Sequence, residues 1–310
     1  MTKFLLTLFS SLSVLLSAQN KPIDKIPFEL TDNNEIFIKC KVNETDSLTF
    51  LFDTGANGTV INSYILGKKI NLNLDKEIEN NGANGIHMVK ISSTNTLQFG
   101  NLKKENLDLL TIDYGADQFD GVFGTNLIDK YIIEIDYDKK ELRLYEPSNY
   151  VYPEKNTSYR KFKMGTLNNG GLYTIKASIK LNGKKHKGDF VLDTGADGVM
   201  SLSQPFVEKY SFDKKLTTVA KATSTGSEGI SVESPIVVLP ELQLNELHFY
   251  NVPSVLYTSG KGESLKTDRA GLFGNSFLKR FNIILDIPNM QIFLKPNNLL
   301  HSPYYDFLIE

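Results

Sequence analysis

One seven-residue stretch occurs twice in this chain, at residues 50–56 and again 140 residues later at residues 190–196. The first copy reads Phe-Leu-Phe-Asp-Thr-Gly-Ala and the second reads Phe-Val-Leu-Asp-Thr-Gly-Ala. In each copy an apolar run typical of a buried strand ends in one acid and a tight polar turn. A carboxylate in such a place is costly unless it is hydrogen-bonded or shared. We therefore predict that Asp53 and Asp193 face each other and share one role.

A second short motif is repeated at a spacing of 150 residues. It reads Gly-Val-Phe-Gly at residues 121–124 and Gly-Leu-Phe-Gly at residues 271–274. A short helix is predicted after each copy: one capped by Thr125 or Asn126 and reaching Tyr131, the other spanning residues 275–281. The repeat thus covers whole halves of the chain. The second half carries a net insertion of ten residues, which we place around residues 258–267.

The segments between these motifs read as strands. Ile36, Ile38, Cys40 and Val42 alternate with mostly polar residues, which is typical of a strand with one buried face. Two repeats are too few for a solenoid, so we predict an all-β protein of two similar lobes, related by a pseudo-two-fold axis, with a cleft between them. The expected segments are a signal peptide over residues 1–18, an N-terminal lobe over 19–150, a linker over 151–162 and a C-terminal lobe over 163–310.

The N-terminus has the pattern of a secretory signal peptide. Lys3 precedes a mostly apolar stretch over residues 4–16, and Ser17 and Ala18 offer a cleavage site of small residues. The apolar run is shorter than the roughly 20 residues that a membrane span needs, which argues against a permanent anchor. We expect an exported protein, periplasmic or secreted, that is not stably inserted in a membrane after cleavage.

Composition excludes several classes of function. The net charge is −2, from 34 basic and 36 acidic residues, so nothing indicates binding to nucleic acid. The single cysteine, Cys40, cannot form an internal disulfide, and its place among alternating apolar residues predicts a buried strand thiol. The four histidines show no metal-ligand spacing, so we expect neither a metal nor another cofactor.

The two repeated turns have the residues that paired-acid chemistry requires. Thr54 and Thr194 place a hydroxyl beside each acid, and Gly55 and Gly195 permit a sharp turn and close backbone approach. Two carboxyl groups side by side cannot both ionise easily, so the pair holds one proton over a wide pH range. The ionised acid can then activate a water molecule as a general base, while the protonated one polarises a carbonyl group as a general acid.

The Asp-Thr-Gly-Ala turns at residues 53–56 and 193–196, together with the Gly-apolar-Phe-Gly motifs, resemble the active-site elements of retroviral-type aspartic proteases. The resemblance covers residues 26–147 and 173–296, so this chain resembles two fused copies of a domain that the retroviral enzymes pair as separate chains. Pepsin-type enzymes share the fused plan. The sequence has no Trp, however, and no flap tyrosine beside Gly82 or Gly229, so the duplicated retroviral type is the closer match.

The resemblance implies an aspartic endopeptidase that acts as a monomer with one site, where Asp53 and Asp193 are the catalytic pair. It implies a peptide or protein substrate bound in an extended conformation. Flexible hairpins cover the cleft in that family. The candidates for their tips here are two glycine-containing segments, marked by Gly82, Gly85, Gly226 and Gly229.

Two alternatives remain at this stage. The same scaffold could bind peptides without cleaving them, because a fold alone does not determine function. Each lobe could instead work in a larger oligomer in which the two acids do not face each other. Among other acids, Asp136 and Asp286 end matching strands and are expected to be turn residues, and Asp197 is expected in a solvated turn.

Overall fold

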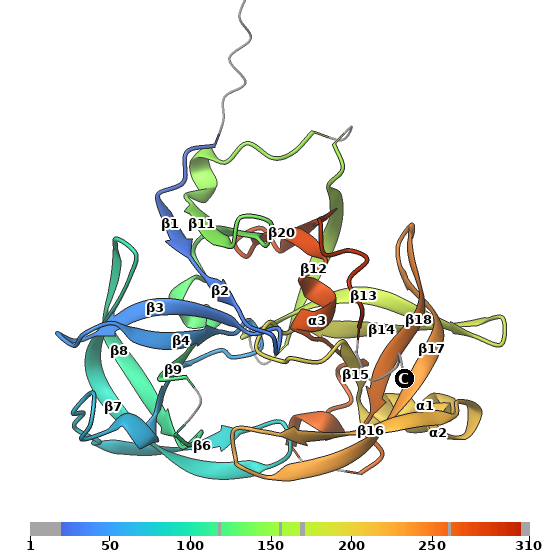
Figure 1. Cartoon of the computed structure of the whole chain (residues 1–310), viewed down its shortest axis with the longest axis horizontal. Helices are drawn as coiled ribbons and strands as arrows, with labels where there is room; N and C mark the ends of the chain where they lie inside the picture. Colours follow the sequence, from blue (N-terminus) through green and yellow to red (C-terminus); the bar gives the residue numbers. More distant parts are fainter. Residues whose placement is uncertain (1–19, 117–118, 155–156, 168–170, 260–261, 305–310) are drawn as a thin grey trace, which may run out of the picture.

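The computed structural model describes residues 20–116, 119–154, 157–167, 171–259 and 262–304. The predicted signal peptide lies outside the described residues. The chain is mostly β and forms two lobes, as predicted, and a shared sheet that was not predicted joins them (Figure 1). No helix within the described ranges is long and apolar enough to cross a membrane.

The N-terminal lobe is one eight-stranded sheet. Its strands are β2 (Glu29–Leu30), β3 (Ile36–Val42), β4 (Leu48–Phe52), β5 (Thr59–Asn62), β6 (Lys76–Asn81), β7 (Ile86–Phe99), β8 (Leu102–Ile112) and β9 (Gly121–Phe123), with the 3-10 helices η1 (Ser63–Ile65) and η2 (Thr125–Leu127). Their spatial order is β2-β3-β4-β9-β5-β8-β7-β6.

The C-terminal lobe repeats this succession of strands. It contains β13 (Leu172–Leu181), β14 (Lys184–Leu192), β15 (Met200–Leu202), β16 (Thr218–Thr225), β17 (Ser231–Leu244), β18 (Leu247–Leu256) and β19 (Gly271–Phe273), with α1 (Gln204–Tyr210), α2 (Phe212–Lys215), η5 (Gly262–Leu265) and α3 (Asn275–Leu278). Their order, β13-β14-β19-β15-β18-β17-β16, matches that of the first lobe from β3 onward. The predicted pseudo-symmetry is therefore present strand by strand.

Six further strands, drawn from both halves, continue the sheet of the C-terminal lobe through the pairing of β12 (Arg160–Leu167) with β13 and make it 13-stranded. They are β1 (Asp24–Pro27), β10 (Ile132–Asp136), β11 (Glu141–Tyr145), β12, β20 (Phe281–Asp286) and β21 (Gln291–Pro296), followed in the chain after β11 by the 3-10 helix η3 (Pro147–Asn149). Their order is β1-β11-β10-β20-β21-β12, and β10 pairs with β20 so that Ile135 lies opposite Ile283. The hairpin that ends each half thus pairs with the other half's hairpin, and one main hydrophobic core runs through both lobes and this sheet.

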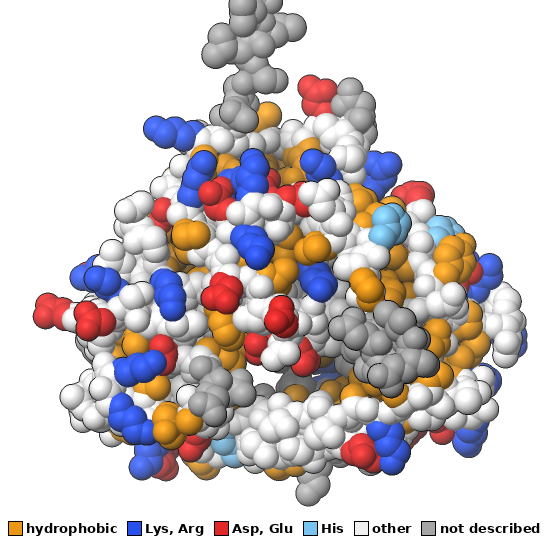
Figure 2. Space-filling model, viewed as in Figure 1, with side chains coloured by type: hydrophobic (Ala, Val, Ile, Leu, Met, Phe, Trp, Pro, Cys, Tyr) orange, Lys and Arg blue, Asp and Glu red, His pale blue; other side chains and the backbone are white. Residues whose placement is uncertain are grey.

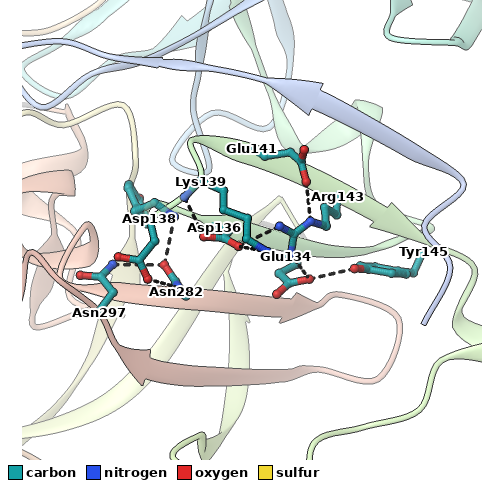
Figure 3. Close-up of polar contacts among 10 residues, drawn as sticks. Glu134, Asp136, Asp138, Lys139, Glu141, Arg143, Tyr145, Asn282 and Asn297 are labelled. Carbon is teal, nitrogen blue, oxygen red and sulfur yellow. Dashed lines mark hydrogen bonds and ion pairs between the residues drawn. The ribbon is translucent and has the colours of Figure 1, made fainter. Parts of the chain in front are cut away.

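A polar network on the shared sheet ties the two halves together (Figure 3). Arg143 on β11 contacts Glu134 (3.1 Å), Asp136 (2.8 Å) and Glu141, and its side chain is only 11% exposed. Across the junction, the Asn282 amide donates to Asp138 (2.8 Å). The charges of these acids and of Arg143 compensate one another, which allows them to stay partly buried.

Several predicted local features are corrected or confirmed by the structure. The helix expected to reach Tyr131 is only the short η2. Gly124 is its cap residue, because the Thr125 hydroxyl bonds to the carbonyl groups of Ala56 and Gly171 instead. The helix expected over residues 275–281 ends at Leu278, since β20 begins at Phe281. Cys40 is a buried strand thiol, as predicted. Only five of the ten inserted residues lie at the predicted place, in the segment with η5, because Val255 of β18 already lies 145 residues after its counterpart Leu110 of β8 and Leu272 of β19 lies 150 after Val122 of β9.

Both acids that end the paired strands of the shared sheet are turn residues, as expected. The Asp136 carboxylate accepts the amide of Lys139 (3.0 Å), and that of Asp286 accepts the amide of Asn289 (3.2 Å). Both side chains are buried. Asp197, by contrast, is exposed, in agreement with a solvated turn.

Candidate active site

Each acid of the repeated turn is placed by the second repeated motif. Asp53 follows β4, which pairs in parallel with β9, and its amide donates to the Phe123 carbonyl (3.0 Å). Asp193 follows β14, which pairs in parallel with β19, and its amide donates to the Phe273 carbonyl (3.0 Å). Strands β5 and β15 pair antiparallel with the other edge of β9 and β19. The two motifs recognised in the sequence are therefore neighbouring strands in each lobe.

The glycine that ends each second motif stands where two backbones meet. A Cβ atom on Gly124 would overlap the carbonyl oxygen of Gly58. The next residue, Thr125, donates its amide to the carbonyl of Ala56 (2.9 Å), which clamps the turn that follows Asp53. The same arrangement recurs in the second half, where Gly274 approaches Gly198 and Asn275 donates to Ala196 (2.7 Å).

The threonines of the two turns join the lobes at the centre of the molecule. The Thr54 hydroxyl donates to the Leu192 carbonyl (2.8 Å) and accepts the Thr194 amide (3.1 Å). Reciprocally, the Thr194 hydroxyl donates to the Phe52 carbonyl (2.8 Å) and accepts the Thr54 amide (3.0 Å). Both threonines are buried. These four bonds hold the turns in one mutual geometry, and buried polar groups of this kind are costly to leave unpaired.

The two carboxyl groups lie against each other across the pseudo-two-fold axis. A Cβ atom on Gly55 would overlap the Asp193 carboxyl group, and one on Gly195 would overlap that of Asp53. Glycine is therefore required in each turn by the approach of the opposite acid. The amide of Gly55 donates to Asp53 (2.7 Å) and that of Gly195 to Asp193 (3.0 Å). We call these two turns, residues 53–56 and 193–196, the floor of the cleft.

The electrostatics of the pair favour one shared proton. Although both side chains are partly exposed to the cleft, removal from water raises both pKa values. For Asp53 the Gly55 amide and the hydrogen bond with Asp193 partly offset this rise in pKa. For Asp193 the charge of Asp53 and the hydrogen bond with it add to the rise, so its pKa lies well above the ordinary value. The two carboxyl groups therefore hold one proton between them, and they titrate as a pair.

Two hairpins, one from each lobe, extend over the floor. The first is β6–β7, with its tip at residues 82–85, and the second is β16–β17, with its tip at residues 226–229. The structure places all four candidate flap glycines at these tips. We call the two tips the roof, and Figure 2 shows a hollow between the lobes that the hairpins bound on one side.

The two tips interlock through side chains that the sequence does not single out. The Asn84 side-chain amide, from the first tip, donates to the carbonyl groups of Ser224 (3.1 Å) and Ile230 (3.0 Å) on the second hairpin. The Asn84 backbone amide donates to the Glu228 carboxylate (2.9 Å). Asn84 is buried in this contact. The insertion in the second half also reaches the first tip, where the Ser264 amide donates to the Ala83 carbonyl (3.3 Å).

A tyrosine from each lobe lies between floor and roof. Burial raises the pKa of Tyr114, and the charges of Asp53 and Glu228 add to that rise. Burial likewise raises the pKa of Tyr257, with contributions from Asp193 and Glu228. Tyr257 also donates to the Ser224 hydroxyl (3.3 Å). Each phenol is thus close to one acid of the floor and to the roof.

Sequence reasoning missed Tyr114, Tyr257, Asn84 and Glu228 as residues of the cleft. Tyr114 follows β8, which pairs in parallel with β5, and Tyr257 follows β18, which pairs in parallel with β15. The position after those strands was the one available signal for the tyrosines. For Asn84 and Glu228 the signal was their place in the predicted tips.

The ends of the cleft are closed by loops that cross between lobes. The Asn34 side-chain amide, between β2 and β3, donates to the Asp197 carbonyl of the other lobe (3.2 Å). The Thr125 hydroxyl donates to the Gly171 carbonyl (3.2 Å) in the corresponding place. Within the described part of the chain, no group of three or more His, Cys, Asp or Glu side chains could hold a metal ion.

Comparison with known proteins agrees with this geometry. The sequence model of the family described as aspartyl protease matches residues 38–127 and 177–277, one match in each half. Among solved structures, the crystal structure of an aspartic proteinase from Irpex lacteus matches with a TM-score of 0.59 and 13% identity, over 91% of this chain and 99% of that chain. At this identity the likeness shows a shared fold. A search of curated proteins returned no match.

Proposed function

Because the chain belongs to the aspartyl protease family, with one match in each half, we propose that it is an endopeptidase that hydrolyses peptide bonds between Asp53 and Asp193. One observation carries the proposal: the two carboxyl groups lie within hydrogen-bonding reach of each other across the lobe interface. A protein that kept the fold without catalysis, or used only one acid, would not require glycine at both positions where the opposite carboxyl group leaves no space for a Cβ atom.

The proposed mechanism assigns each acid the role that its surroundings favour. Ionised Asp53 takes a proton from a bound water molecule, whose oxygen attacks the carbonyl carbon of the scissile peptide bond. Protonated Asp193 donates a hydrogen bond to the carbonyl oxygen, where negative charge develops in the transition state. As the intermediate collapses, a proton passes to the leaving nitrogen, the C–N bond breaks, and the pair returns to its one-proton state.

The substrate we propose is a peptide or protein segment in an extended conformation. The hollow is bounded by the floor and by two hairpins whose edges can add backbone hydrogen bonds to a strand-like ligand. The roof is closed in this structure, so substrate entry requires the tips to part, as lid-like elements do in many enzymes. We also propose that the protein is exported through the apolar N-terminal segment at residues 1–18 and acts as a monomer.

The test is digestion of a diverse peptide mixture at acidic to neutral pH, with products identified by mass spectrometry. The wild-type protein is expected to cut within peptides, and the double variant Asp53→Asn, Asp193→Asn is expected to be inactive while keeping its circular dichroism spectrum. Cleavage by the double variant would contradict the mechanism. Binding of peptides by the wild-type protein without hydrolysis at any pH would support the non-catalytic alternative.

A further inference from the structure

Glu228, at the second tip, is an acidic side chain that the proposed chemistry leaves unused. Its Oε1 atom accepts the Asn84 amide, whereas its Oε2 atom is buried without a hydrogen-bond partner. Among the residues that the structure describes, no Lys or Arg forms an ion pair with it. A buried carboxylate oxygen is normally paired, because an unpaired one loses its hydration without compensation. The roof therefore contains an acid with one carboxylate oxygen bonded and the other without a partner.

The two tips are shaped around this carboxylate. A Cβ atom on Gly82 of the first tip would overlap the Oε2 atom of Glu228. A Cβ atom on Gly226 of the second tip would overlap both carboxylate oxygens. Two of the four tip glycines thus leave room for one side chain, which places the Glu228 carboxylate at the junction of the two hairpins.

The Glu228 carboxylate lies near enough to both tyrosines of the cleft to act on them through its charge. Its charge contributes to the raised pKa of both Tyr114 and Tyr257, the two phenols that are likewise close to the acids of the floor. Ser224 lies near the end of β16 on the same hairpin, and its hydroxyl accepts a hydrogen bond from the Tyr257 hydroxyl. A peptide lying on the floor would therefore pass beneath Glu228.

We propose that Glu228 is a specificity-determining residue that selects peptides with a Lys or Arg side chain close to the scissile bond; this rests on the proposed protease function. When the tips part to admit substrate, Glu228 loses the Asn84 amide and is left with two free oxygens. A substrate ammonium or guanidinium group replaces that amide, and the new bond joins two opposite charges, whereas the Asn84 donor carries none. A cationic peptide thereby stabilises the substrate-bound state more than a neutral one does.

The test compares two peptides that differ only by Lys or norleucine at one position, varied along the peptide around a common cleavage site. For the wild-type protein, kcat/KM is expected to favour the Lys peptide by about tenfold or more at the best position, the size of one charge-assisted hydrogen bond. In Glu228→Gln this ratio is expected to fall towards one. In Glu228→Lys the preference is expected to reverse in favour of a Glu peptide. High salt should reduce the wild-type preference.

Glu233→Gln is the matched control, because Glu233 lies on the same hairpin with an exposed side chain paired to Lys221. This variant should keep the wild-type ratio. Equal kcat/KM for the two peptides in the wild-type protein, or a preference that survives in Glu228→Gln, would overturn the inference. If no peptide is cleaved at all, the protease proposal fails, and binding of the same fluorescent peptides decides the role of Glu228. The inference is supported if the wild-type protein binds the Lys peptide more tightly than the norleucine peptide and Glu228→Gln does not. It is refuted if the wild-type protein binds both peptides equally.

Discussion

The floor and the roof of the cleft are each built from one segment of either lobe, yet the pairs differ in kind. On the floor, both segments have the sequence Asp-Thr-Gly-Ala, and every hydrogen bond of the Thr54 side chain has its counterpart at Thr194. On the roof, the first tip contributes the buried amide of Asn84 and the second contributes the carboxylate of Glu228.

This difference shows where duplication constrains the chain and where it leaves freedom. The acid, the threonine and the glycine of each floor turn contact the opposite turn, so a change in one copy disturbs the other. The roof residues contact unlike partners, so each tip can change separately. The two acids of the floor are likewise bound to each other's state, because a coupled pair that shares one proton titrates as a unit.

The largest expected effect comes from breaking the pair itself. Asp53→Asn and Asp193→Asn should each reduce kcat by about 10³-fold or more, since each removes a group from one acid–base unit. Groups that act as a unit are strongly non-additive, so the double variant should be little worse than either single one. Steady-state kinetics on one peptide measures all three. If the fold-reduction in kcat of the double variant equalled the product of the two single reductions, the acids would not act as a unit.

The hydrogen bonds of the Thr54 and Thr194 hydroxyl groups allow the symmetry of the floor to be tested through the stability of the fold instead of through activity. Thr54→Val and Thr194→Val should destabilise the fold by similar amounts, about 1–3 kcal/mol for each buried backbone group left without a partner. Urea unfolding measures both variants. Thr223→Val, at an exposed position on the second hairpin, is the control and should change little. A large difference between the two floor variants would contradict the symmetry.

The pH dependence of stability tests the raised pKa of Asp193. Because the folded-state pKa of Asp193 is raised, its protonated form stabilises the fold at low pH, and this contribution is lost as pH rises through the raised pKa. The free energy of unfolding of the wild-type protein should therefore fall relative to that of Asp193→Asn as pH rises above about 4. Unfolding measured at a series of pH values checks this. The opposite trend would mean that the pair is stabilised when fully ionised.

The smallest expected effect concerns the roof. Asn84→Ala removes two bonds between the hairpins, so the amides near both tips should exchange with deuterium faster while global stability changes by about 1 kcal/mol or less. Asn81→Ala, at an exposed position of the first hairpin, should leave exchange unchanged. Unaltered exchange in Asn84→Ala would show that the tips are held by other contacts.

Much of the floor could be predicted from the sequence because its signals are local and duplicated. An apolar strand, an acid and a glycine turn lie within seven residues, and the second copy fixes which acid is the partner. Gly55 and Gly195 were predicted to allow close approach, and the structure adds what approaches them: the opposite carboxyl group.

The remaining parts depend on contacts between distant segments. Asn84 and Glu228 are 144 residues apart, and no local pattern indicates that a backbone amide of one tip meets the carboxylate of the other. The pairing of β10 with β20 was missed for the same reason, although both hairpins were predicted. The length of η2 was overestimated because the Thr125 hydroxyl bonds to the floor turn at Ala56 rather than capping a helix.

One measurement tests most directly whether the two halves form a single site. A peptide with a secondary alcohol in place of the scissile amide imitates the tetrahedral intermediate and can be titrated into the protein by calorimetry. We predict one bound molecule per chain, with binding strongly weakened in both Asp53→Asn and Asp193→Asn. Two bound molecules per chain, or full binding in either variant, would contradict a site shared by both acids.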